Sequence, residues 1–166
     1  MSTQTWVARF GAGFLALVWG GIIVAQAPAN ALQVRAIAEV ESKSVESGRA
    51  VVKLIAADRV VPGDRVIYTL EARNTGATAL DVPIVTYAVP DHVRYIANSA
   101  VGPGAEVRFS IDGGHSFDRA ENLKVSGPDG RPRAVVGADI THIRWQLKNS
   151  LNANSVAFVR FRARVE

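Results

Sequence analysis

Three arginines near the end of the sequence, Arg160, Arg162 and Arg164, recur at every second position. Alternate side chains of a β-strand share one face, so this spacing predicts a stripe of guanidinium groups. Arg144 and Arg108 would extend the stripe if their strands were neighbours of the last one. Such a stripe can bind an acidic polymer such as lipopolysaccharide, an anionic glycan or nucleic acid. The sequence alone favours the alternative, a solvated face whose charges prevent pairing with other sheets.

The charge balance adds little to a nucleic-acid interpretation. The chain has 19 Lys and Arg against 15 Asp and Glu, a formal net charge of +4. This excess is mild, and neither a recognition helix nor a row of exposed aromatic residues accompanies the arginines. We therefore expect no nucleic-acid partner.

Residues 110–117 have the spacing S-x-D-x-G-x-x-F, which resembles the Asp-box of sialidases and other β-propellers. Asp112 can cap backbone N–H groups across a tight turn, Gly113 and Gly114 can supply positive φ, and Phe117 can pack beneath the turn. The pattern therefore predicts a structural hairpin. A glycosidase in which Asp112 is catalytic is the alternative, although a sialidase would need several propeller blades.

Metal and catalytic motifs are missing from the sequence. None of the three histidines, His92, His115 and His142, has a second ligand two or four residues away, so we expect no zinc site. Aspartates near turns could bind calcium, but capping of the turns is the default interpretation: Asp58, Asp64, Asp81 and Asp112. The sequence has no nucleophile elbow, phosphate loop or H-E-x-x-H motif, and we predict neither enzymatic activity nor a cofactor.

Hydrophobic residues alternate with a period close to two along most of the chain, which predicts an all-β domain. Strands are expected at about 34–40, 51–57, 66–73, 81–89, 93–96, 107–111, 141–147 and 156–165, and loops at 42–49 and 126–137. Short strands separated by turn signals favour an antiparallel β-sandwich of about seven to nine strands.

Two groups of residues should shape this sandwich. Those with turn chemistry are Pro62, Gly63, Asp64, Asn74, Gly76, Asp112, Gly113 and Gly114. Those expected in the core by strand parity or size are Tyr68, Phe109, Phe117, Trp145 and Phe161.

Residues 1–31 have the pattern of a cleaved signal peptide. Arg9 precedes an apolar run of 16 residues, and the small residues Ala29 and Ala31 flank Asn30 before Leu32. An uncleaved anchor is the alternative, but the run is short for the roughly 20 residues that span a bilayer. The chain has no cysteine, so neither a disulfide nor a lipidated cysteine is possible. We expect a bacterial protein exported to the periplasm or beyond, with no transmembrane segment after cleavage.

The order of these signals resembles the DUF11, or conserved repeat, domain of bacterial and archaeal envelope proteins, over about residues 52–165. The opening block has Pro62-Gly63-Asp64 before the first strand and Asn74-Thr75-Gly76 after it. Residues 86–96 resemble the second block, and residues 141–165 resemble the tail. Tyr87 stands where family members commonly have an aspartate. The resemblance implies a single immunoglobulin-like sandwich with no catalytic residues.

We accordingly expect residues 32–50 to form a strand and polar loop that are part of, or lead into, a DUF11-like sandwich over residues 51–166. The predicted function is a non-enzymatic structural or protein-interaction module of the cell envelope. Its partner would be another envelope protein or a surface polymer. The alternative is a binding module for anionic envelope glycans or lipopolysaccharide, which would use the arginines. A pilus-assembly chaperone is less consistent, because such chaperones carry two immunoglobulin-like domains.

Overall fold

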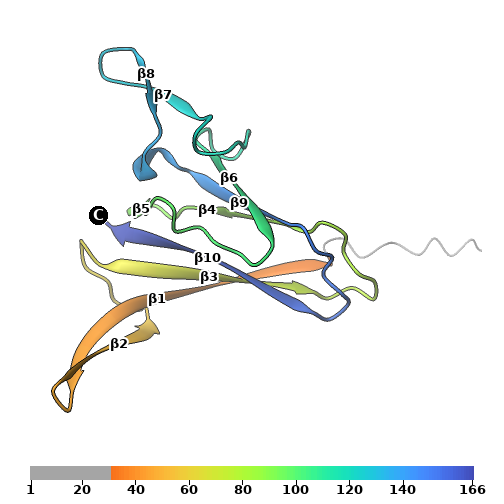
Figure 1. Ribbon diagram of the computed structural model, residues 1–166, viewed down its shortest axis with the longest axis horizontal. Coiled ribbons are helices and arrows are strands. Elements are labelled where there is room, and N and C mark those ends of the chain that lie inside the picture. Colours follow the sequence, from red (N-terminus) through yellow and green to blue (C-terminus); the bar gives the residue numbers. More distant parts are fainter. Residues whose placement is uncertain (1–30) are drawn as a thin grey trace, which may run out of the picture.

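The computed structural model describes residues 31–166, and the fold there is all-β (Figure 1). The predicted signal peptide, apart from Ala31, lies outside the described residues. A five-stranded antiparallel sheet has the order β2 (Arg49–Ala56), β1 (Leu32–Glu46), β3 (Arg65–Asn74), β10 (Val156–Val165) and β5 (Val93–Tyr95). A three-stranded antiparallel sheet has the order β4 (Ile84–Ala88), β9 (His142–Leu147) and β6 (Ala105–Ser110).

The two sheets pack face to face in a sandwich-like arrangement. Phe161 of β10 and Trp145 of β9 are fully buried, and their ring centroids lie 6.2 Å apart between the sheets. Tyr68 stacks on Phe161 at 4.8 Å, and Phe109 packs at the edge of the same core. The alternation predicted for β9 and β10 is confirmed, since Ile143, Trp145 and Leu147 are buried, as are Val159, Phe161 and Ala163.

Two predicted loops are wrong. Residues 42–46 continue β1, and a turn at Ser47 and Gly48 joins it to β2. Both turn residues have positive φ, 51° and 77°, as a two-residue hairpin requires. The polar residues misled the prediction because this part of the hairpin extends past the three-stranded sheet (Figure 1), so it needs no buried face.

The Gly- and Pro-containing stretch 126–137 also holds regular structure. Strands β7 (Lys124–Ser126) and β8 (Pro132–Ala134) pair as a small hairpin, and the 3₁₀ helix η1 (Gly137–Asp139) follows. A bidentate ion pair fixes this segment, because Arg133 Nη1 and Nη2 lie 2.7 and 2.8 Å from the Asp139 oxygens. The glycines and proline at 127–130 therefore form only the tip of the hairpin.

Two predicted turns flank β3. The Pro62-Gly63-Asp64 turn is closed by the Asp64 carboxylate, which accepts a hydrogen bond from Val61 N at 2.9 Å. Asn74 ends the strand and is fully buried. Its Nδ2 donates to Leu151 O at 2.9 Å, and its Oδ1 accepts from Gly76 N at 2.9 Å. The turns therefore determine where β3 begins and ends.

Candidate functional site: an arginine cluster on the five-stranded sheet

The outer face of β10 carries three exposed arginines at alternate positions. Because inward residues alternate with outward ones, burial of Phe161 and Ala163 leaves Arg160, Arg162 and Arg164 exposed on the side away from the core. These three arginines therefore form the predicted stripe.

Pairing with the neighbouring strands widens the stripe. Arg164 lies directly opposite Arg65 of β3 and Arg94 of β5, so three arginines form one row across three strands. Side chains that face each other in this way have Cβ atoms about 5 Å apart, and like charges at that distance are destabilising. We call Arg65, Arg94, Arg160, Arg162 and Arg164 the arginine cluster.

Few carboxylates neutralise the cluster. Arg94 forms an ion pair with Glu166, and Arg162 Nε lies 4.0 Å from Glu41 Oε1. No described carboxylate lies within 4.0 Å of the side-chain nitrogens of Arg65, Arg160 or Arg164, although Glu41 and Asp64 line one open pocket with Arg65. The cluster therefore keeps an excess of positive charge, and its planar guanidinium groups can donate paired hydrogen bonds to carboxylate or phosphate.

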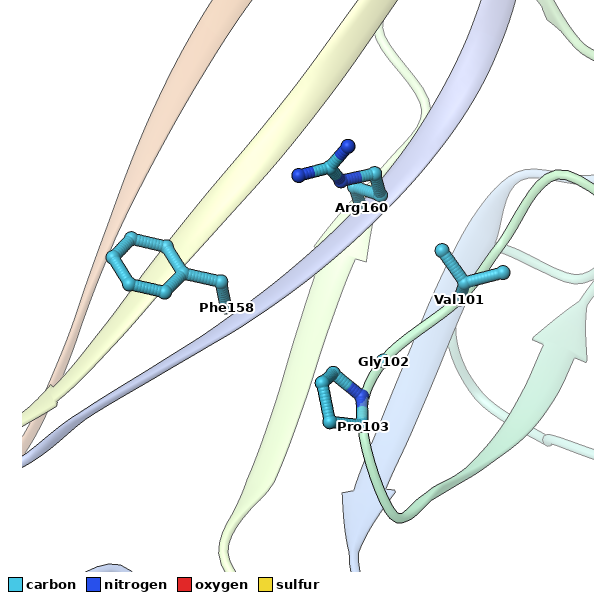
Figure 2. Close-up of a pocket in the computed structure, with 5 residues that line it drawn as sticks. All are labelled: Val101, Gly102, Pro103, Phe158 and Arg160. Atoms are coloured by element: carbon cyan, nitrogen blue, oxygen red, sulfur yellow. The ribbon is translucent and has the colours of Figure 1, made fainter.

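An open groove of about 470 Å³ adjoins the cluster (Figure 2). Phe158 and Arg160 project from β10 on one side, and the segment Val101, Gly102 and Pro103 forms the other. Phe158 is 50% exposed. The groove thus places an apolar ring beside a guanidinium group.

Backbone hydrogen bonds join the two sides of the groove. Val101 N and Arg160 O are 2.9 Å apart, as are Arg160 N and Val101 O. Gly102 permits this close approach, because a Cβ atom there would lie 2.7 Å from Val159 Cγ1. The groove could not be predicted from the sequence, because its two sides come from segments more than fifty residues apart.

The expectation that Arg144 and Arg108 join the stripe is wrong. They face each other across β9 and β6, in the other sheet. Since the inner faces of the two sheets contact each other, their outer faces lie on opposite sides of the sandwich. Arg144 is also engaged: its Cζ lies 3.6 Å from the centroid of the Phe117 ring, and its Nε donates to Thr86 Oγ1 at 3.1 Å.

The same contact corrects the placement of Phe117. Its ring lies under the Arg144 guanidinium on the outer side of β9 and is not part of the core cluster. A cation–π contact of this kind stabilises a partly exposed ring outside the core between the sheets.

Residues 110–117 form the predicted hairpin, with Asp112 as its centre. The Asp112 carboxylate accepts hydrogen bonds from the N–H groups of His115 and Ser116, at 3.1 and 3.0 Å, and from the hydroxyl groups of Ser110 and Ser116. Gly113 and Gly114 have φ of 75° and 89°. The Ser110 hydroxyl, followed by the Ser116 hydroxyl and N–H, holds the pKa of Asp112 well below its usual range.

Of the other polar residues considered from the sequence, His92 and His142 line one open pocket together with Asp91, but they form no metal site. Within residues 31–166, no three His, Asp or Glu side chains are placed to share a metal ion. His92 occupies a turn with φ of 64°, and the Nδ1 of His142 is 3.2 Å from Thr141 Oγ1. Asp64 is used as a turn cap. The arginine cluster is therefore the best candidate site in the described part of the chain.

No helix among residues 31–166 has the length and hydropathy needed to cross a membrane. Comparison of the chain with protein-family models, curated proteins and solved structures finds no match.

Sequence reasoning missed two members of the cluster, Arg65 and Arg94. Arg65 is the first residue of its strand, and Arg94 is the middle residue of a strand of three. Neither has a second arginine two residues away on its strand, so the alternation that reveals Arg160, Arg162 and Arg164 does not reveal them. Their relation to Arg164 depends on strand pairing over long sequence distances, which a single sequence does not reveal.

Proposed function

We propose that this chain is a non-catalytic, exported envelope protein that binds an anionic glycan or lipopolysaccharide through the arginine cluster. The observation that carries the proposal is the row formed by Arg65, Arg164 and Arg94. Like charges placed directly opposite each other reduce stability, so a fold that keeps three in a row is best explained by an anionic ligand.

The shape of the site favours a polymer over a small ion. Phe158, Arg160, Arg162 and Arg164 follow one another at alternate positions of β10, and this line is about 20 Å long at the usual rise per residue. The groove at one end offers the Phe158 ring, on which the apolar face of a sugar can rest, beside a guanidinium group for its acidic substituent. A nucleic acid would be expected to use several stacking aromatics, and this line has one.

Export and fold type belong to the same proposal. Strand β1 begins at Leu32, the residue at which the predicted mature chain begins. This agreement supports cleavage of the signal peptide. The facing antiparallel sheets and the buried Trp145 support an immunoglobulin-like sandwich of the DUF11 kind.

The glycosidase alternative gains no support from the geometry of Asp112. A general acid in such an enzyme needs a raised pKa, whereas hydrogen bonds lower the pKa of Asp112. Its two oxygens are already occupied by donors of the hairpin. We propose that Asp112 serves the fold alone.

Binding to defined polymers tests the proposal. Isothermal titration with polygalacturonate and with lipopolysaccharide micelles should show binding that weakens as salt rises, and neutral dextran should show none. Replacing Arg160, Arg162 and Arg164 by Ser should weaken binding about a hundredfold or more, because each charge-assisted hydrogen bond contributes about 1.5 kcal/mol or more.

A matched variant controls for total charge. Replacing Arg119, Lys124 and Arg131 by Ser removes three exposed positive charges that lie outside the five-stranded sheet. This variant should bind as the wild type does. An equal loss of binding affinity in the two triple variants would overturn the proposal. So would a wild-type protein that binds neither polymer.

A further inference from the structure

Strand β2 has one edge without a partner strand among residues 31–166. It stands at the end of the sheet order, next to β1 alone. Its side chains Val52, Leu54 and Ile55 are 56%, 46% and 49% exposed, and Val45 of β1, which faces Ala50, is 76% exposed. The hairpin of these two strands extends past the rest of the sandwich (Figure 1), so the described residues leave this edge accessible.

Several of the usual means of blocking an edge are missing from β2. Edge strands are protected by proline, by bulges, by charged side chains or by being short, and of these β2 has only the charges of Arg49 and Lys53. Strand β2 contains no proline, and its register with β1 is uninterrupted over eight residue pairs, from Glu39 with Ala56 to Glu46 with Arg49. An apolar strand of this length is a template for pairing with another strand.

The hydrogen bonding of β1 and β2 shows which groups of β2 point outward. Ala57 N donates to Ala38 O at 3.0 Å. Since residues of an antiparallel strand alternate between bonding toward one neighbour and the other, the N–H and C=O groups of Ala50, Val52 and Leu54 point away from β1, as do those of Ala56 at the end of the strand. These three residues also share one face of the strand.

We propose that β2 pairs antiparallel with β2 of a second copy of this chain, about a two-fold axis at Val52. A two-fold axis perpendicular to the sheet places Val52 opposite itself and Ala50 opposite Leu54 of the second copy. All three pairs across the axis on this face are then apolar. The two sheets become one continuous sheet, and no edge strand remains at the junction.

Charge disfavours the two neighbouring registers, with the axis at Val51 or at Lys53. With Val52 at the axis, Arg49 faces Ile55 and Lys53 faces Val51, so no positive charge faces another. An axis at Lys53 would place two ammonium groups opposite each other. With the axis at Val52, the outward-pointing backbone groups of Ala50, Val52 and Leu54 are all paired, and those of Ala56 lie beyond the paired stretch.

The arrangement has a consequence for the arginine cluster. A two-fold axis perpendicular to the sheet keeps the outer faces of both copies on the same side. The two clusters would then face one way, and one polymer could contact both. Dimerisation itself does not depend on the proposed ligand.

Cysteine crosslinking tests the pairing, because the chain has no cysteine of its own. In Val52→Cys, the two thiols would face each other across an antiparallel pair, with Cα atoms about 5.5 Å apart, a separation that suits a disulfide. Val136→Cys is the matched control, since Val136 is 55% exposed and lies outside the hairpin. At micromolar protein, mild oxidation should crosslink Val52→Cys about tenfold faster or more, because pre-association raises the effective thiol concentration.

Sedimentation equilibrium gives a second measurement. The wild-type chain should be a dimer, and Val52→Lys should be a monomer with an unchanged circular dichroism spectrum, because two ammonium groups would meet at the axis. A monomeric wild type at about 100 μM, a concentration at which a specific interface should persist, would overturn the proposal. Equal crosslinking rates in the two cysteine variants, or capture only of other proteins, would overturn it as well.

Discussion

The hairpin of residues 110–117 and the arginine cluster are both polar and exposed. They differ in whether hydrogen-bond partners within the fold surround the charged group. The Asp112 carboxylate is surrounded by N–H and hydroxyl donors of its own hairpin. Arg164 instead faces two further arginines, and no described carboxylate pairs with it. A charge that the fold already satisfies serves stability, whereas a charge that the fold leaves in repulsive contact is available to a ligand. Substitutions in the two regions should therefore have different effects.

The largest effect on stability is expected at Asn74, where the polar group is both buried and fully bonded. Asn74→Ala would leave the Thr78 carbonyl and the Gly76 N–H without their partner, and the Leu151 carbonyl would keep only its bond from Leu80 N–H. Loss of these bonds should lower the free energy of unfolding by about 3 kcal/mol, as measured by urea denaturation.

Asn149→Ala provides the control for that substitution, because Asn149 is exposed. It should change the free energy of unfolding by no more than about 0.5 kcal/mol. Similar values for the two variants would show that the amide of Asn74 does not hold its two segments together.

A smaller, pH-dependent effect is expected at Asp112. Because its pKa is lowered in the folded state, the carboxylate stabilises the fold fully above about pH 4, and this stabilisation is lost as the pH falls toward the lowered pKa. Asp112→Asn should therefore melt at a lower temperature than the wild type at pH 7, and the difference should shrink in acid.

Thermal melts between pH 7 and pH 2 measure this difference. Asp91→Asn is a suitable control, since Asp91 is an exposed aspartate in a turn. A constant gap between wild type and Asp112→Asn at every pH would mean that the hydrogen bonds to the carboxylate do not stabilise the hairpin.

The smallest effect has the opposite sign and lies in the arginine cluster. Arg164→Thr removes repulsion with Arg65 and Arg94 and introduces a residue that suits a strand. The free energy of unfolding should rise by about 0.5 kcal/mol at low salt, and the gain should shrink as salt screens the charges.

Arg160→Thr is the matched variant for that measurement. Arg160 faces Thr69, so its removal relieves no direct repulsion and should bring no comparable gain. If Arg164→Thr destabilised the protein instead, the row would have to be counted among the contacts that hold the sheet together.

The strands of the sandwich could be predicted where one face is buried. Strands β9 and β10 alternate cleanly because each contributes every second residue to the core between the sheets. The β1–β2 hairpin was missed in part because neither of its faces is covered near the tip, so residues 42–46 carry no such alternation. Hydrophobic alternation arises where one face of a strand is buried, so it does not reveal a strand that is exposed on both sides.

The candidate site was predicted in part for a related reason. Three of its arginines follow one another on one strand, and alternation alone places them on one face. Arg65 and Arg94 join them only through the pairing of β10 with β3 and β5, and Arg144 is separated from them because β9 belongs to the other sheet. Which strands become neighbours is a property of the whole fold.

Titration of the isotopically labelled protein with a short polygalacturonate chain, followed by backbone amide NMR, tests the role of the arginine cluster most directly. We predict saturable shifts of the amide signals of β10, β5, Arg65 and Val101, with the signals of residues 110–117 unchanged. Higher salt should reverse the shifts. Shifts confined to residues 110–117, or none at saturating ligand, would contradict the assignment of ligand binding to the cluster.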